Sequence, residues 1–188
     1  MKISKFNEEG YRDMTAYDAI RNVEARNYLK GKQNKAAGQF FEKQIEAACL
    51  YYKTEGIAHI EKNSEPFRIT RNVGNGRFEG FFEKEGQPDY KGTLAPDGKA
   101  VCFEAKHTTA DRIKQEVVKE HQMDSLKLHQ KLGAICFVLV SIGNDGVFRV
   151  PIDVWNNMKE IYGRKYLTAA DIQEYKVKNK GLVYYFLP

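Results

Sequence analysis

Hydrophobic positions recur along the chain with helical spacing in some segments and strand-like spacing in others. Between residues 36 and 54 they fall at steps of three or four, as Phe41 and Ile45 do, which predicts an amphipathic helix. The same spacing over residues 112–132 predicts a second, longer helix. Residues 134–142 are almost continuously apolar, which is typical of a strand buried on both faces of a sheet.

Shorter segments predict the other strands, and turn residues separate them. Asn75-Gly76 is a strong hairpin signal, and Pro96-Asp97-Gly98 predicts a second turn. The expected order of helix, strands, helix, strand, helix and strand is that of a mixed α/β domain. The remaining predicted elements are strands at 57–60, 67–71, 89–94, 99–106, 147–150 and 182–187, a helix at 153–162 and a short helix capped by Thr168.

The predicted hairpin around Asn75-Gly76, about residues 68–86, is rich in basic and aromatic side chains. Its phenylalanines are difficult to bury within a glycine-rich, charged hairpin, which favours an exposed use such as stacking on nucleic-acid bases. Packing of the same rings on the domain is the alternative. The candidate DNA-binding residues of this hairpin are Arg68, Arg71, Arg77, Phe78, Phe81, Phe82 and Lys84.

Residues 1–35 differ from the rest of the chain in charge, with eight basic and five acidic residues and tyrosines interleaved among them. We expect a basic N-terminal arm or short helix here, ahead of a catalytic domain at residues 36–188. Lys32 and Lys35 are candidate phosphate contacts. A solvated surface helix is the alternative interpretation of the same charges.

Composition sets broad limits on function. With 188 residues, 42% of them hydrophobic, the chain can form one domain with a substantial core. Its longest apolar run falls far short of the roughly 20 residues of a transmembrane helix, and no apolar stretch follows the first lysines as in a secretory signal. Thirty Lys and Arg against 25 Asp and Glu give a net charge of +5, a mild bias toward a polyanionic partner that excludes histone-like coating of nucleic acid.

The three cysteines, Cys49, Cys102 and Cys136, form no CxxC pair and lie among apolar residues. We therefore expect buried thiols rather than metal ligands, in a protein of a reducing compartment such as the cytoplasm. The four histidines are scattered and lack the spacing of a zinc site.

Candidate chemistry is concentrated in two predicted strands: Asp89 begins the first, and Glu104-Ala105-Lys106 ends the second. Because side chains alternate along a strand, Glu104 and Lys106 share a face, and antiparallel pairing can bring Asp89 beside them. Two adjacent carboxylates repel unless a cation compensates, and Mg²⁺ accepts a few carboxylate oxygens while keeping room for waters and phosphate. A lysine on the same face can stabilise charge on phosphorus, so this set is suited to phosphodiester hydrolysis.

Each of these residues also has an ordinary explanation, because Glu-x-Lys is common as an ion pair on exposed strands and Pro-Asp is a common turn. Three features favour catalysis: Glu104 follows an apolar run, an apolar strand follows one helix later, and a helix carrying Glu42 precedes the sheet. This order resembles the core of the PD-(D/E)XK nuclease fold, a mixed β-sheet flanked by helices.

Seven motifs in order make the resemblance closer, over about residues 31–170. The chain resembles RecU-type Holliday junction resolvases, from a bacterium or a phage, and the hairpin at 68–86 aligns with the projecting stalk of that family. The matching segments are Gly38-Gln39-Phe40-Phe41-Glu42, residues 57–62 with Pro66, Asp89-Tyr90-Lys91-Gly92, Phe103-Glu104-Ala105-Lys106, Glu120-His121-Gln122, residues 133–138 and Gly163-Arg164-Lys165.

The resemblance implies a role for each matched residue. Asp89 and Glu104 would hold Mg²⁺, which Mn²⁺ can replace, and Lys106 would stabilise the transition state. Gln122 would be a further metal ligand or would position water, and a half-buried structural amide is the alternative. Gln87 stands where the family has a metal-binding Thr. Glu42 would contact metal through water or pair with a lysine.

These roles imply an endonuclease that resolves four-way DNA junctions with symmetric nicks, as a homodimer and alongside recombination proteins, with Lys165 as a further DNA contact. Two other functions are consistent with the residues. One is another PD-(D/E)XK nuclease, of fork, repair or restriction type. The other is a non-catalytic junction-binding protein on the same fold.

Overall fold

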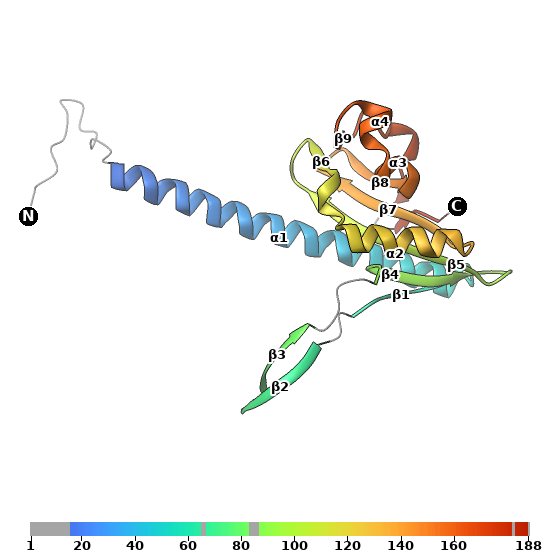
Figure 1. Cartoon of the computed structure of the whole chain (residues 1–188), viewed down its shortest axis with the longest axis horizontal. Helices are drawn as coiled ribbons and strands as arrows, with labels where there is room; N and C mark the ends of the chain where they lie inside the picture. Colours follow the sequence, from blue (N-terminus) through green and yellow to red (C-terminus); the bar gives the residue numbers. More distant parts are fainter. Residues whose placement is uncertain (1–15, 65–66, 83–86, 182, 188) are drawn as a thin grey trace, which may run out of the picture. The chain divides into compact units, whose positions relative to one another are not determined.

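The computed structural model describes residues 16–64, 67–82, 87–181 and 183–187 (Figure 1). The chain divides into two units, Met1–Ala37 and Gly38–Pro188. Of the first unit the structure describes one feature, the beginning of the helix α1 (Ala16–Thr54), whose residues 23–36 are exposed. Within the described residues, no helix has the length and hydrophobicity needed to cross a bilayer.

The second unit is built on a five-stranded mixed sheet with the strand order β1-β4-β5-β7-β8. β5 pairs antiparallel with β4 and parallel with β7, and α2 (Glu120–Lys131) lies in the connection between β5 and β7. This confirms the predicted mixed α/β class. The strands are β1 (Ala58–Lys62), β4 (Tyr90–Leu94), β5 (Lys99–Thr108), β7 (Ile135–Ile142) and β8 (Gly146–Pro151).

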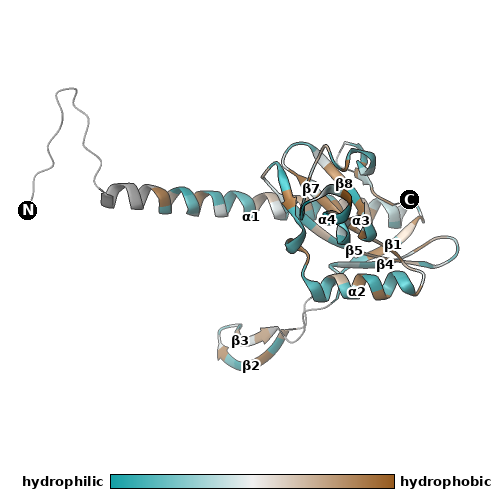
Figure 2. Cartoon of the chain, turned by 45° about the horizontal axis from the view of Figure 1, so that its top comes forward, coloured by the Kyte–Doolittle hydropathy of each residue, from teal (hydrophilic) through white to brown (hydrophobic). Residues whose placement is uncertain are grey.

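Hydrophobic side chains cover both faces of this sheet. On one face, buried residues of α1, such as Phe41 and Ile45, pack with the C-terminal Phe186. On the other, Leu126 of α2 packs with residues of two short helices, α3 (Ile152–Asn156) and α4 (Met158–Tyr162). Figure 2 shows the hydrophobic residues of β7 and β8 in brown, consistent with the predicted strand buried on both faces.

Three aromatic rings stack across neighbouring strands on the α1 face of the sheet. The Tyr90 ring of β4 lies 4.8 Å from that of Phe103 on β5, and Phe103 lies 4.8 Å from Phe137 on β7, each pair being nearly parallel. The same residues are register partners in the sheet. The rings therefore help to align β4, β5 and β7, and the middle one of these strands, β5, carries Glu104.

Two predicted helices differ from the structure. The helix expected over 112–132 starts only at Glu120, because residues 112–114 form β6 (Arg112–Lys114), which pairs with the distant β9 (Tyr166–Thr168). A 3-10 turn, η1 (Gln115–Val117), follows β6. The helix expected over 153–162 is interrupted at Asn157 and becomes α3 and α4.

The chain's ends also differ from expectation. The helix expected to start at residue 36 is the second half of α1, which starts at Ala16. The short helix expected after Thr168 is a turn followed by the 3-10 turn η2 (Gln173–Tyr175). The last strand, β11 (Val183–Tyr185), pairs with β10 (Lys178–Lys180) in a separate two-stranded sheet, and residue 182 of the predicted strand lies outside the described residues.

The predicted hairpin is confirmed up to residue 82 as a two-stranded sheet of its own, β2 (Phe67–Gly74) with β3 (Arg77–Phe82). Residues 83–86 of the predicted hairpin lie outside the described residues. Asn75 and Gly76 both have positive φ, as the tight turn between twisted strands requires. Residues 67–81 are all exposed. At Gly80 the strands approach so closely that a Cβ would overlap the carbonyl oxygen of Arg68, so this position requires glycine.

Candidate active site

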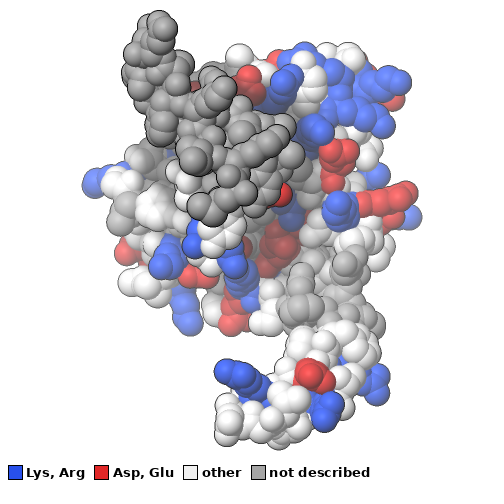
Figure 3. Space-filling view, turned by 90° about the vertical axis from the view of Figure 1, so that its left-hand side faces the viewer, with Lys and Arg blue, Asp and Glu red and all other residues white. Residues whose placement is uncertain are grey.

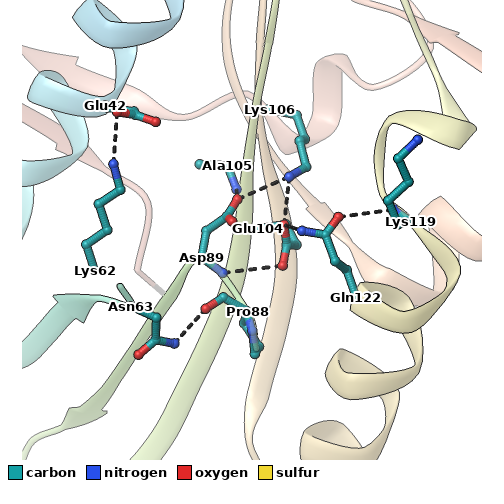
Figure 4. A network of polar contacts seen from close by, with 10 residues as sticks. All are labelled: Glu42, Lys62, Asn63, Pro88, Asp89, Glu104, Ala105, Lys106, Lys119 and Gln122. Carbon is teal, nitrogen blue, oxygen red and sulfur yellow. Dashed lines mark hydrogen bonds and ion pairs between the residues drawn. The ribbon is translucent and has the colours of Figure 1, made fainter. Parts of the chain in front are cut away.

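The start of β4 lies beside the middle of β5, and this brings Asp89, which directly precedes β4, next to Glu104. Tyr90 is the register partner of Phe103, so Asp89 reaches the level of Glu104. The backbone N–H of Asp89 donates to Glu104 Oε1 at 3.3 Å, and the backbone N–H of Ala105 donates to Asp89 Oδ2 at 3.0 Å. These reciprocal bonds hold both carboxylates in place without using all of their oxygens (Figure 4).

Lys106 joins the two carboxylates. Its Nζ lies 2.7 Å from Glu104 Oε2 and 3.2 Å from Asp89 Oδ2. The Glu104 side chain is completely buried, whereas 32% of the Asp89 side chain and 19% of the Lys106 side chain are exposed. The sequence placed these three residues on one face of adjacent strands, and the structure brings all three together.

The charge balance of this cluster is uneven, with two carboxylates and one ammonium. Burial raises the pKa of Glu104 to about 8; the positive charge of Lys106 opposes this shift, and the negative charge of Asp89 adds to it. Burial also acts to lower the pKa of Lys106, but the charges of Glu104 and Asp89 outweigh it, so that pKa is raised. An additional positive charge beside Glu104 would therefore favour its ionised form.

Gln122, in the first turn of α2, completes the surroundings of Glu104. Its Nε2 donates to Glu104 Oε2 at 2.8 Å, and its Oε1 accepts a hydrogen bond from the backbone N–H of Lys119 at 3.1 Å (Figure 4). The amide oxygen of Gln122 is therefore already hydrogen-bonded to the backbone N–H of Lys119, directly before α2. The contacts favour a role for Gln122 in positioning Glu104 over one as a metal ligand.

Asn63, which the sequence did not single out, holds the other side of the site. Its Nδ2 donates to the carbonyl of Pro88 at 2.6 Å, and its backbone N–H donates to the carbonyl of Asp89 at 2.8 Å. Asn63 directly follows β1, so it ties the edge strand to the segment that presents Asp89. The sequence gave no signal beyond a polar residue at the end of a predicted strand.

Gln87 and Glu42, which were also predicted to contact the metal, form none of the hydrogen bonds described above for Asp89 and Glu104. Gln87 Oε1 accepts a hydrogen bond from Lys91 at 3.2 Å, and Glu42 pairs with Lys62 at 2.9 Å. For Glu42 this is the lysine pairing that the sequence left open as an alternative. Gln87 is close to Asp89 in the sequence and Glu42 is not, and the described contacts of both side chains are with lysines.

The predicted DNA-binding residues fall in three regions. Arg68, Arg71, Arg77, Phe78 and Phe81 are exposed on the hairpin, where Figure 3 shows blue basic side chains. Strand β3 includes Phe82, whereas Lys84 lies outside the described residues. Lys32 and Lys35 are exposed in the first unit, and the Lys32 Nζ lies 4.8 Å from the ring centre of Tyr28.

Lys165 lies in a third region, a cleft of about 740 Å³ between β6, α2 and β9. Lys114 and Lys127 line the same cleft, and so does Glu120, two residues before Gln122. The cleft thus adjoins the helix turn that contacts Glu104. Its walls carry four basic side chains, Lys114, Lys127, Arg164 and Lys165, and three acidic ones, Glu116, Glu120 and Asp124.

The donor chemistry of the site fits a divalent cation. Asp89 and Glu104 supply carboxylate oxygens, which Mg²⁺ prefers. Glu104 is buried, and the single positive charge of Lys106 does not balance the two negative charges of Glu104 and Asp89. Asp89 and Glu104 would supply part of a coordination shell, and water and substrate would supply the rest, as is usual for Mg²⁺.

Comparison with known proteins agrees with the motif resemblance. The family described as "Recombination protein U" matches residues 36–186. A Holliday junction resolvase RecU of Bacillus pumilus is 26% identical over 175 residues, covering 87% of this chain and 83% of the relative. One of Ligilactobacillus salivarius is 30% identical over 148 residues, covering 73% and 68%. The Hjc resolvase of Archaeoglobus fulgidus has a TM-score of 0.43 at 11% identity, covering 71% of this chain and 90% of Hjc.

Proposed function

Because the chain belongs to the RecU family, we propose that it is a Holliday junction resolvase, an endonuclease that cuts four-way DNA junctions in recombination and repair in the cytoplasm. The observation that carries the chemistry is the convergence of Asp89, Glu104 and Lys106 from two adjacent strands. A protein that only binds junctions would have no need for a buried carboxylate whose ionisation is opposed by its surroundings.

Each residue of the cluster has a distinct role in this proposal. Asp89 and Glu104 would hold Mg²⁺, or Mn²⁺ in its place, and a bound divalent cation would supply Lewis-acid activation of water and of the scissile phosphate. Lys106, already positioned by both carboxylates, would donate to a phosphate oxygen as negative charge develops there. Gln122 and Asn63 would keep the two carboxylates in register.

The exposed hairpin would supply selectivity for branched DNA. Its arginines suit the phosphates around a junction centre, and Phe78 and Phe81 present rings on which unpaired bases can stack. We propose that the cleft lined by Lys127 and Lys165 receives the backbone of a duplex arm. Two symmetric nicks require two active sites, which a homodimer with twofold symmetry would provide.

The proposal is tested by incubating wild type and Glu104→Gln with a labelled four-way junction and with a linear duplex of the same sequence, in Mg²⁺ or in EDTA. We expect paired symmetric nicks in the junction alone, lost with EDTA and with Glu104→Gln. Equal cutting of the linear duplex would indicate a general nuclease. Tight junction binding without cutting in any metal would indicate a recognition protein.

A further inference from the structure

Two of the three cysteines face each other across the central sheet. Cys102 on β5 and Cys136 on β7 are register partners in the parallel pair, and both side chains belong to the core cluster on the α2 face. Cys102 is 3% exposed and Cys136 is 8% exposed. The pair is therefore a dithiol held together by the backbone, which the spacing of the cysteines in the sequence does not reveal.

The distance between the strands permits a covalent bond. Neighbouring strands lie about 4.8 Å apart, which is within the range of about 4.4–6.8 Å between the Cα atoms of disulfide-linked cysteines. The bond would require some movement, because linked Cβ atoms lie about 3.8 Å apart, closer than paired strands normally hold them. Closing the bond would therefore draw β5 and β7 together at this position.

Cys102 stands two residues before Glu104 on the same strand and the same face. A shift of β5 at Cys102 thus acts directly on the carboxylate that Lys106 and Gln122 contact at 2.7 and 2.8 Å. We propose that Cys102 and Cys136 form a reversible disulfide that slows the nuclease, a regulation that rests on the function proposed above.

A peroxide is the oxidant that this step requires, and the reaction balances. The sulfur of one cysteine attacks one peroxide oxygen, the O–O bond breaks, and the thiol proton leaves with the released oxygen as water, giving a sulfenic acid. The sulfur of the other cysteine then attacks the sulfenic acid sulfur, the S–O bond breaks, and the second thiol proton leaves with hydroxide as water. Two thiols lose two electrons, and hydrogen peroxide becomes two waters.

The test treats the folded full-length protein with hydrogen peroxide, alkylates the remaining thiols and maps tryptic peptides by mass. Cleavage after Lys99, Lys106, Lys131 and Arg149 places Cys102 in peptide 100–106 and Cys136 in peptide 132–149. We expect these two peptides as a linked species, lighter than their sum by two hydrogen atoms and absent after treatment with dithiothreitol. Cys49 is the internal control, because it is also 8% exposed but packs in the opposite core cluster.

Junction nicking is measured on the same samples. We expect oxidation to lower the rate by roughly tenfold or more, because small displacements of catalytic groups are costly, and dithiothreitol to restore it. Cys136→Ser should give no linked peptide and lose the peroxide sensitivity, and Cys49→Ser should retain both. Cys102→Ser is a second variant with the same expectation.

Absence of the linked species from the folded wild type would overturn the proposal, as would links that include Cys49 as often as Cys136. A disulfide-linked protein that nicks junctions as fast as the dithiol form would overturn the proposed regulation. A reduced protein that cuts no DNA would contradict the proposed nuclease function instead, whereas the peptide masses would still decide whether the disulfide forms.

Discussion

The Gln122 amide donates to the Glu104 carboxylate at 2.8 Å across 18 positions of sequence, linking the first turn of α2 to the middle of β5. The same amide accepts a hydrogen bond from the backbone of Lys119. Gln122 is thus held at both ends, and the position of Glu104 depends on where α2 begins.

Replacing Gln122 by Ala should lower the rate of junction nicking by roughly 10–100-fold while leaving the protein folded, because supporting hydrogen bonds to metal-binding groups have effects of this size. The measurement is single-turnover nicking at saturating Mg²⁺, with circular dichroism as the check on folding. Gln130→Ala on the same helix is the matched control, since Gln130 contacts only the exposed Asp153 among its described side-chain partners. Equal rates for the two variants would contradict the positioning role.

Divalent metal should stabilise the wild type against heat but not Asp89→Asn. A ligand at 100 times its dissociation constant stabilises the folded state by about 2.7 kcal/mol. Melting curves in Mg²⁺ and in EDTA measure the difference. Asp97→Asn, in the turn between β4 and β5, is the control and should retain the metal response. A metal response that persists in Asp89→Asn would exclude Asp89 as a ligand.

Neutralising Lys127 and Lys165 should weaken the salt dependence of DNA binding. Each lost phosphate contact reduces the slope of log K against log salt concentration by about 0.9 on duplex arms. Binding to uncut junctions in EDTA, measured over a range of salt, gives the slope for Lys127→Ala, Lys165→Ala and the double variant. Lys178→Ala, which lies outside this cleft on β10, should leave the slope unchanged. Unchanged slopes for all variants would exclude the cleft as the path of the backbone.

Gly80→Ala should disturb the hairpin and little else. The added methyl would meet the Arg68 carbonyl oxygen and the Phe67 ring, forcing β2 and β3 apart. Because residues 67–81 are exposed, we expect an unchanged melting temperature but roughly tenfold weaker junction binding, equivalent to about 1.4 kcal/mol. Gly38→Ala in α1, where a Cβ meets nothing within 4 Å, is the control. Full junction affinity in Gly80→Ala would show that hairpin geometry does not contribute to recognition.

Asp171 should make stability depend on pH in the acid range. Burial acts to raise its pKa, but hydrogen bonds from Thr168 and the Arg164 guanidinium outweigh it, so the pKa is lowered. A lowered carboxyl pKa adds stability that is present above the ordinary value and is lost as pH falls through the lowered one.

Asp171→Asn should therefore cost about 2 kcal/mol of unfolding free energy at neutral pH, the usual size for a hydrogen bond to a charged group, and less as the wild-type carboxylate is protonated. Urea unfolding at several pH values measures this difference. Asp145→Asn in the exposed β7–β8 turn is the control. A cost for Asp171→Asn that stays constant into acid would contradict the role of its charge.

The cluster of Asp89, Glu104 and Lys106 was predictable because its signals are local. Strand alternation places Glu104 and Lys106 on one face, the Pro96-Asp97-Gly98 turn joins two strands, and antiparallel pairing then brings Asp89 beside them. The Asn75-Gly76 hairpin was predictable for the same reason. The positions of Asp89, Glu104 and Lys106 could be predicted from the β4–β5 hairpin alone.

Features that depend on distant pairing were not predictable. Helical spacing extends through residues 112–119, but Ile113 pairs with Leu167 of β9, and the sheet contact overrides the local preference. Asn63 acts on the site through Pro88, 25 positions away, which no periodicity indicates. The contact between Cys102 and Cys136 depends on the register of two parallel strands joined by a helix.

The stacked rings of Tyr90, Phe103 and Phe137 have a consequence for how this protein tolerates change. They lie on the face of the sheet opposite Glu104, yet they align the strands that carry both carboxylates. A genetic screen for lost activity should therefore recover substitutions in this aromatic layer together with those at the acidic residues. The function proposed for the acidic residues would therefore limit which substitutions the aromatic layer on the opposite face of the sheet can accept.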